Sequence, residues 1–147
     1  MSTQNTSPAD QNRYRTFEDL EVYQVAREFR KSMYRVNRRL PSLEKFELGS
    51  QIRRAAVSLT NNIAEGHGRF HYLEQIKFCL NSRGSLEELL DDLNICRDES
   101  YLPRAESLGL REESPAYGLT EDQLDELLAD QGGPPASTLQ PFNASTV

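Results

Sequence analysis

The stretch EVYQVAREFRKSMYRVNRRLP, residues 21–41, decides the fold class of this chain. Pro41 ends the pattern, because proline disfavours helical geometry in the residue before it. Thr16 and Asp19, just upstream, have the spacing of a capping box. The apolar residues recur every three or four positions, as on one stripe of an α-helix: Val22, Ala26, Phe29, Met33, Val36 and Leu40. We therefore predict an amphipathic helix over residues 17–40.

The same helical rhythm returns twice downstream. Residues 43–65 carry the stripe Leu48, Ile52, Ala55, Leu59 and then Ile63 or Asn62. Gly66 and Gly68 follow, and glycine tolerates the positive φ that is common where helices end. Residues 72–100 carry the longest stripe, namely Tyr72, Ile76, Cys79 or Leu80, Leu86, Leu90 and Leu93. Short links between long amphipathic helices predict antiparallel neighbours.

The segment after Leu102 breaks this pattern. Its prolines and glycines predict irregular or weakly helical backbone over residues 102–118. A short helix at residues 119–130 then offers Leu124, Leu127 and Leu128. We predict an all-α, up-down antiparallel four-helix bundle over residues 16–130 with a short, atypical fourth helix. The polar residues 1–15 and 131–147 lack apolar periodicity and are predicted to be disordered tails.

Charge is distributed unevenly along the 147 residues, whose formal net charge is −6. Residues 98–147 hold ten acidic residues against Arg104 and Arg111, whereas residues 14–97 have a small positive excess. The chain shows neither a run of about 18 apolar residues nor a signal-peptide pattern, so we expect a cytoplasmic protein. Cys79 and Cys96 fall roughly 25 Å apart on one predicted helix. That separation excludes a disulfide between them and predicts two reduced, partly buried thiols.

Two polar clusters interrupt the predicted second and third helices: Asn62, Glu65 and Gly66, and then Arg83, Gly84 and Ser85. The register of Arg83 places its stem on the core-facing side, where a buried charge needs a partner such as Glu65 or Glu87. Gly84 would let a neighbouring helix pass close. We interpret the two clusters as a structural polar clamp.

Several arginines are candidates for contact with phosphates: Arg38, Arg39, Arg53, Arg54 and Arg69, with Arg30 and Arg35 nearby. The competing interpretation is an ordinary solvated helix face, because the positive excess is small for a nucleic-acid binder. His67 and His71 are separated by Gly68 and make a poor metal site. The sequence shows no nucleophile with a base and no phosphate-binding glycine loop. We expect no enzyme activity, metal, cofactor or small-molecule substrate.

Three blocks of the sequence resemble a known family: FEDLEVYQVAREF at 17–29, LGSQIRRAAVSLTNNIAEGHGR at 48–69 and FCLNSRGSLEELLDDL at 78–93. In order and content they resemble the four-helix bundle proteins called 23S rRNA-intervening sequence proteins. That family includes the accessory subunit of diversity-generating retroelements. The resemblance covers about residues 17–102. The chain departs from the family pattern after Leu102, where a long apolar fourth helix would begin.

The resemblance implies more about assembly than about chemistry. Most members have no assigned activity, whereas the accessory branch forms a pentameric ring that binds a reverse transcriptase and nucleic acid. We therefore expect a non-enzymatic, self-assembling scaffold or accessory subunit. Its partners would be other copies of itself, as a pentamer, and a reverse transcriptase or an RNA. The alternative function is a nucleic-acid-binding protein that contacts phosphates through its arginine clusters.

Overall fold

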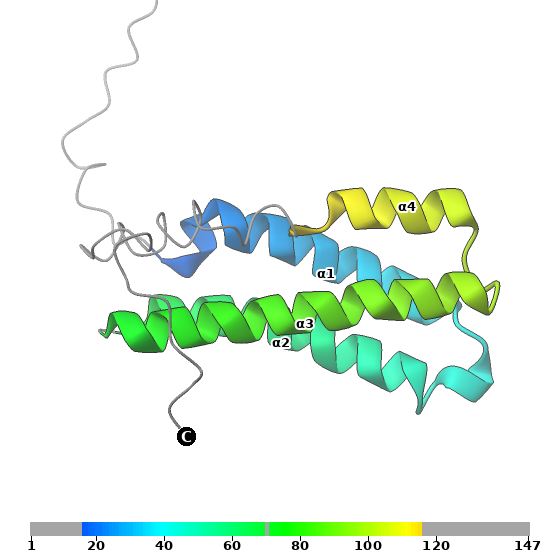
Figure 1. Cartoon of the computed structure of the whole chain (residues 1–147), viewed down its shortest axis with the longest axis horizontal. Helices are drawn as coiled ribbons and strands as arrows, with labels where there is room; N and C mark the ends of the chain where they lie inside the picture. The colour runs from blue at the N-terminus through cyan, green and yellow to red at the C-terminus, as the bar shows by residue number, and fades with distance from the viewer. Residues whose placement is uncertain (1–15, 70, 116–147) are drawn as a thin grey trace, which may run out of the picture.

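In the part of the chain that the structure describes, four helices run alternately up and down (Figure 1). The computed structural model describes residues 16–69 and 71–115. Its elements are the 3-10 turn η2 (Phe17–Asp19), α1 (Glu21–Arg39), the 3-10 turn η3 (Ser42–Glu44), α2 (Leu48–His67), α3 (Tyr72–Asp98) and α4 (Arg104–Glu113). The predicted all-α antiparallel architecture with a short fourth helix is confirmed. No helix within the described residues is long and apolar enough to cross a membrane.

The first helix is shorter than predicted at its N-terminal end. The backbone N–H of Thr16 donates to Asp19 Oδ2 at 3.1 Å, so the predicted capping pair is formed. It closes the turn η2, however, and extended backbone at Leu20 separates this turn from α1. At the other end Leu40 is extended, with φ −64° and ψ 147°, which confirms that Pro41 stops the helix.

The second helix begins at Leu48 and not near residue 43. Glu44 defines this start, because its Oε2 accepts the Leu48 N–H at 3.3 Å at the positive end of the helix dipole. The helix also continues through Gly66 to His67. Gly68 takes a right-handed conformation with φ −82°, so the positive φ expected here is wrong. Gly66 serves close packing instead, since an added Cβ would lie 3.0 Å from the Cβ of Phe78 on α3.

The third helix ends in a Schellman motif. The N–H of Tyr101 donates to the Cys96 carbonyl at 2.7 Å, and that of Ser100 donates to the Arg97 carbonyl at 3.0 Å. Ser100 has φ 61°, the left-handed conformation that this motif requires and that glycine adopts most easily. The motif turns the chain sharply, so α4 runs back antiparallel to α3.

The fourth helix lies upstream of the residues predicted to form it. α4 lies within residues 102–118, where irregular or weakly helical backbone was predicted. Pro103 precedes the helix and costs it no hydrogen bond, because N–H groups of the first turn have no helical partner. Ser107 and Leu110 are buried, and Arg111 donates to the Leu90 carbonyl of α3 at 3.0 Å. The helix predicted at residues 119–130 lies outside the described residues, as do both predicted tails.

The apolar stripes of α1 and α2 form the core as predicted. Every stripe residue from Val22 to Val36 in α1 and from Leu48 to Ile63 in α2 is buried. The apolar residues of α3 are only partly buried. Cys79, Leu86, Leu89 and Leu93 are buried, whereas Leu80 is exposed. Buried polar residues share this face of α3, namely Gln75, Ser82, Ser85 and Asp92.

Candidate nucleic-acid interface

The outer side of α1 carries a row of basic side chains. Four of them line a hollow of about 510 Å³ together with Tyr34 of α1 and Val57 of α2: Arg30, Lys31, Arg35 and Arg38. They share one side of α1 because residues three, four or seven apart in a helix face the same way. The hollow is therefore electropositive on its α1 side.

The neighbouring side of α2 extends this surface. Arg53 and Arg54 line a second hollow of about 570 Å³, which Tyr34 and Val57 also border. Because both hollows share these two residues, they form one continuous surface across α1 and α2. We call it the basic face, defined by Arg30, Lys31, Arg35, Arg38, Arg53 and Arg54. Among the described residues, Glu65 is the one carboxylate that lines either hollow.

Specific contacts hold several of these cations in place. Arg30 Nη1 donates to Thr60 Oγ1 at 2.8 Å, so this α1 side chain is tied to α2. Arg53 Nη2 donates to the Lys45 carbonyl at 3.2 Å, while Lys31 pairs with Glu28 at 2.8 Å. The Lys31 hydrogen bond lowers the pKa of Glu28, although burial opposes the effect. Arg38 and Arg54 are exposed. The face thus combines oriented cations with cations open to solvent.

The centre of the basic face is aromatic and apolar. Tyr34 is half-buried and Val57 is exposed, and both border the two hollows. An aromatic ring among arginines is an arrangement on which a nucleic-acid base can stack while phosphates contact the surrounding charges. The arrangement suits a flexible single strand, whose bases are free to leave a stack.

The structure divides the five predicted arginines. It brings Arg38, Arg53 and Arg54 together on the basic face and leaves two elsewhere. Arg39 pairs with Glu106 of α4. Arg69 lies at the C-terminal end of α2, with its guanidinium 5.0 Å from the Phe78 ring centroid and 4.0 Å from Glu65 Oε2. These two do not extend the cluster.

Sequence reasoning missed two members of the surface, Lys31 and Tyr34. The helical spacing of Arg30, Lys31, Tyr34, Arg35 and Arg38 would have shown that they share one side of α1. The position of Arg54 beside them depends on how α2 packs, which local spacing does not show.

The structure places two residues of the predicted polar clamp, Asn62 and Ser85, beside Ser58. Ser85 Oγ lies 2.8 Å from Ser58 Oγ, and Asn62 Nδ2 donates to the same oxygen at 2.9 Å, so Ser58 links α3 to α2. Arg83 is exposed, and so its predicted core-facing position is wrong. Gly84 also faces open space, since an added Cβ would meet nothing within 4 Å. Both follow from the rotation of α3, which turns Ser82 and Ser85 toward α2 instead.

The remaining reactive side chains do not assemble into a site. Cys79 and Cys96 are buried free thiols, as predicted, and burial is the main cause that raises the pKa of each to about 11. His67 is buried and His71 is exposed just before α3. In residues 16–69 and 71–115 no three His, Cys, Asp or Glu side chains gather closely enough to hold a metal ion. The basic face is therefore the strongest candidate for function.

Comparison with known proteins identifies one matching family. A family model described as 23S rRNA-intervening sequence protein matches residues 18–116, which include all four helices. No curated protein matches the chain. The match ends at residue 116, just after α4, so the matched region includes α4 and the segment at 119–130 lies outside it.

Proposed function

Because the chain belongs to the 23S rRNA-intervening sequence protein family, we propose that it is a non-enzymatic binding protein whose basic face contacts the phosphates of a nucleic acid. One observation carries this proposal. Two consecutive helices, α1 and α2, bring six basic side chains to one continuous surface around Tyr34, and among the described residues Glu65 is the carboxylate that lines its hollows. The net charge of −6 conceals this local excess.

Binding of this kind has a defined physical signature. Each Lys or Arg that neutralises a phosphate releases a condensed counterion, so affinity falls steeply with salt. Contacts to phosphates carry no base information, and stacking on Tyr34 is tolerant of sequence. We therefore expect weak, salt-sensitive binding with little sequence preference. An RNA, or an RNA held by a reverse transcriptase, would be a partner with this chemistry.

The test is fluorescence anisotropy with a labelled single-stranded RNA of about 20 nucleotides at several salt concentrations. Arg38→Ala combined with Arg54→Ala should reduce the slope of log K against log salt by about 1.4, because each lost contact to a single strand removes about 0.7. The matched control is Arg83→Ala, which removes an exposed arginine from α3. Equal losses in both variants, or binding that is independent of salt, would contradict the proposal.

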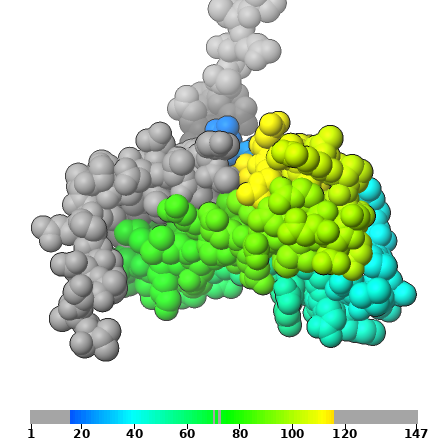
Figure 2. Space-filling model, turned by 45° about the vertical axis from the view of Figure 1, so that its right-hand side comes forward, coloured from blue at the N-terminus to red at the C-terminus, as the bar shows by residue number. Residues whose placement is uncertain are grey.

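A second candidate function, self-assembly, is favoured by two exposed apolar patches. Leu43 and Phe46 are 71% and 78% exposed in the connection between α1 and α2, which projects from the bundle (Figure 2). Leu73 and Leu80 are 73% and 54% exposed and lie seven residues apart along α3. Because α2 and α3 are antiparallel, the two patches lie toward opposite ends of the bundle. A contact between unlike patches of two copies is heterologous and closes into a ring if its rotation allows.

This arrangement supports the homo-oligomer that the family resemblance predicts, a pentamer. Light scattering should give a mass above that of the 16.8 kDa monomer. Phe46→Ser and Leu73→Ser should each give monomers, because each removes one half of the same contact. Mixing the two variants should restore dimers, since one intact contact remains possible. Leu108→Ser is the control, because Leu108 is an exposed leucine on α4. A monomeric wild-type chain at micromolar concentration would exclude self-assembly.

A further inference from the structure

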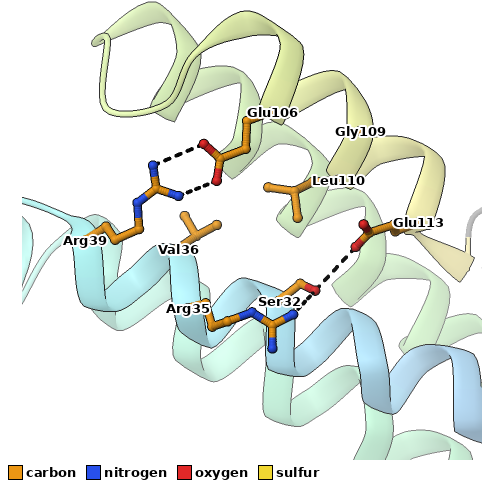
Figure 3. Close-up of a pocket in the computed structure, with 8 residues that line it drawn as sticks. All are labelled: Ser32, Arg35, Val36, Arg39, Glu106, Gly109, Leu110 and Glu113. Carbon is orange, nitrogen blue, oxygen red and sulfur yellow. Dashed lines mark hydrogen bonds and ion pairs between the residues drawn. The ribbon is translucent and has the colours of Figure 1, made fainter.

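A cleft separates α4 from α1 beside the basic face (Figure 3). It has a volume of about 420 Å³. Ser32, Arg35 and Arg39 line its α1 side, at positions i, i+3 and i+7 of one helix. Glu106 and Glu113 line the α4 side and point toward them. The cleft thus places two carboxylates opposite two guanidinium groups.

The carboxylates occupy positions that suit the oxygens of an anion. Arg39 donates from both terminal nitrogens to both carboxylate oxygens of Glu106, with Nη2 and Oε2 at 3.0 Å. This pairing raises the pKa of Arg39 and lowers that of Glu106. A guanidinium binds a phosphate in the same two-point geometry. Arg35 Nη2 donates to Ser32 Oγ at 2.8 Å, and Ser32 Oγ lies 3.4 Å from Glu113 Oε2.

The cleft is continuous with the basic face through Arg35. This side chain lines both the cleft and the hollow beside Tyr34. A strand that crosses the basic face would therefore meet Arg35 and then the Arg39–Glu106 pair. Both side chains of that pair are partly exposed, at 50% and 36%, so a phosphate can reach Arg39 from solvent.

Release of Glu106 does not require α4 to leave the bundle. Other contacts hold this helix on α3. Arg111 Nη1 donates to the Leu90 carbonyl and to Asn94 Oδ1, each at 3.0 Å, and Leu110 is buried in the core cluster. The Glu106 side chain can therefore turn away from Arg39 while α4 keeps its place.

We propose that Ser32, Arg35 and Arg39 form a phosphate subsite of the nucleic-acid surface, and that the Glu106 carboxylate occupies this subsite until a phosphate displaces it. The inference rests on the proposed function. It gives α4 a role as an internal competitor that lowers affinity for polyanions. Removing the Glu106 charge should strengthen binding, and it should do so only while Arg39 is present.

The test compares four variants with the wild-type chain in the RNA anisotropy assay. Glu106→Gln should bind about two- to fivefold more tightly at low salt, and its salt slope should steepen by about 0.7, the value for one added contact to a single strand. Glu112→Gln is the matched control, because it removes the same charge from an exposed position on α4. Arg39→Ala combined with Glu106→Gln should bind no more tightly than Arg39→Ala alone.

The outcomes separate this inference from the proposed function. If the wild-type chain binds through Arg38 and Arg54 but Glu106→Gln matches Glu112→Gln, the subsite is wrong and the basic face stands. The subsite is also wrong if the gain from Glu106→Gln persists without Arg39. If neither the wild-type chain nor Glu106→Gln binds the RNA, the proposed function fails and the inference fails with it.

Discussion

Asp92 is a buried acid in α3 whose removal should stabilise the protein at neutral pH. Its side chain is 2% exposed, and its Oδ2 has no hydrogen-bond partner among the described residues. Burial, together with the neighbouring charges of Glu88 and Asp91, raises the pKa of Asp92 from 3.8 to about 6. The folded protein therefore holds this proton more tightly than the unfolded chain does.

The difference between the folded and unfolded pKa values of Asp92 makes the stability of the protein depend on pH. Below about pH 3.8 Asp92 is protonated in both states, and its raised pKa costs no stability. As the pH rises from there to about 6, stability is lost, because the unfolded chain releases the Asp92 proton while the folded protein still holds it. At about 1.4 kcal/mol for each tenfold change in proton affinity, the full cost is at most about 3 kcal/mol. Since the amide introduced by Asp92→Asn is also polar and buried, we expect a net gain of about 1 to 3 kcal/mol at pH 7.5.

Urea unfolding followed by circular dichroism checks this value. The difference between Asp92→Asn and wild type should be large at pH 7.5 and close to zero at pH 3.5. Glu87→Gln is the control, because Glu87 is an exposed acid on the same helix and is not among the charges that raise the pKa of Asp92. A variant that is less stable than wild type at pH 7.5, or a gain of equal size at both pH values, would refute the reasoning.

Three further predictions concern packing and backbone geometry. Ser100→Gly should raise the free energy of unfolding by about 1 kcal/mol, because glycine adopts the positive φ at this position without strain, and thermal melting beside Ser50→Gly would check it. Gly49→Ala should destabilise the fold by about 1 to 3 kcal/mol, since its Cβ would lie 2.7 Å from Asn37 Oδ1 and 2.9 Å from the Glu44 carbonyl; Gly109→Ala, where an added Cβ meets nothing within 4 Å, should not. Cys79 and Cys96 should react with a thiol reagent at pH 8 only after denaturant is added, because a pKa of about 11 leaves about one thiol in a thousand ionised; rapid reaction of the native chain would contradict their burial.

Local sequence signals predicted the helices well where one stripe was purely apolar. In α1 and α2 the residues of the predicted stripes inside the helices are buried, because burial follows directly from the helical period. Residues outside those stripes are buried as well, namely Ser32, Gly49, Ala56, Thr60, Gly66 and His67. In α3 the prediction was weaker. Ser82 and Ser85 face α2 through hydrogen bonds, with Ser82 Oγ 2.7 Å from the Leu59 carbonyl. Polar residues on a buried face blur the stripe, and Arg83 was consequently assigned to the wrong side.

The position of the fourth helix could not be predicted from local sequence. Gly109 lowers the intrinsic preference of residues 104–113 for a helix, and Pro103 stands directly before them, so the sequence predicted irregular or weakly helical backbone. Contacts with α3 offset this low helix propensity. Ser107 and Leu110 are buried, and the Arg111 side chain binds the backbone of α3. The tertiary environment therefore decides where this short helix forms.

The sequence by itself determined the all-α class, the up-down order of the helices and the stop at Pro41, because periodicity and proline geometry are properties of neighbouring residues. Only the tertiary structure decided which arginines lie together. Arg38 and Arg54 meet on one face, whereas Arg39 is neutralised by Glu106, 67 positions away. The physical reason is that charge pairing and the burial of Asp92 depend on the rotation of each helix against its neighbours. Packing of the whole bundle fixes that rotation, and no local stretch of the chain encodes it.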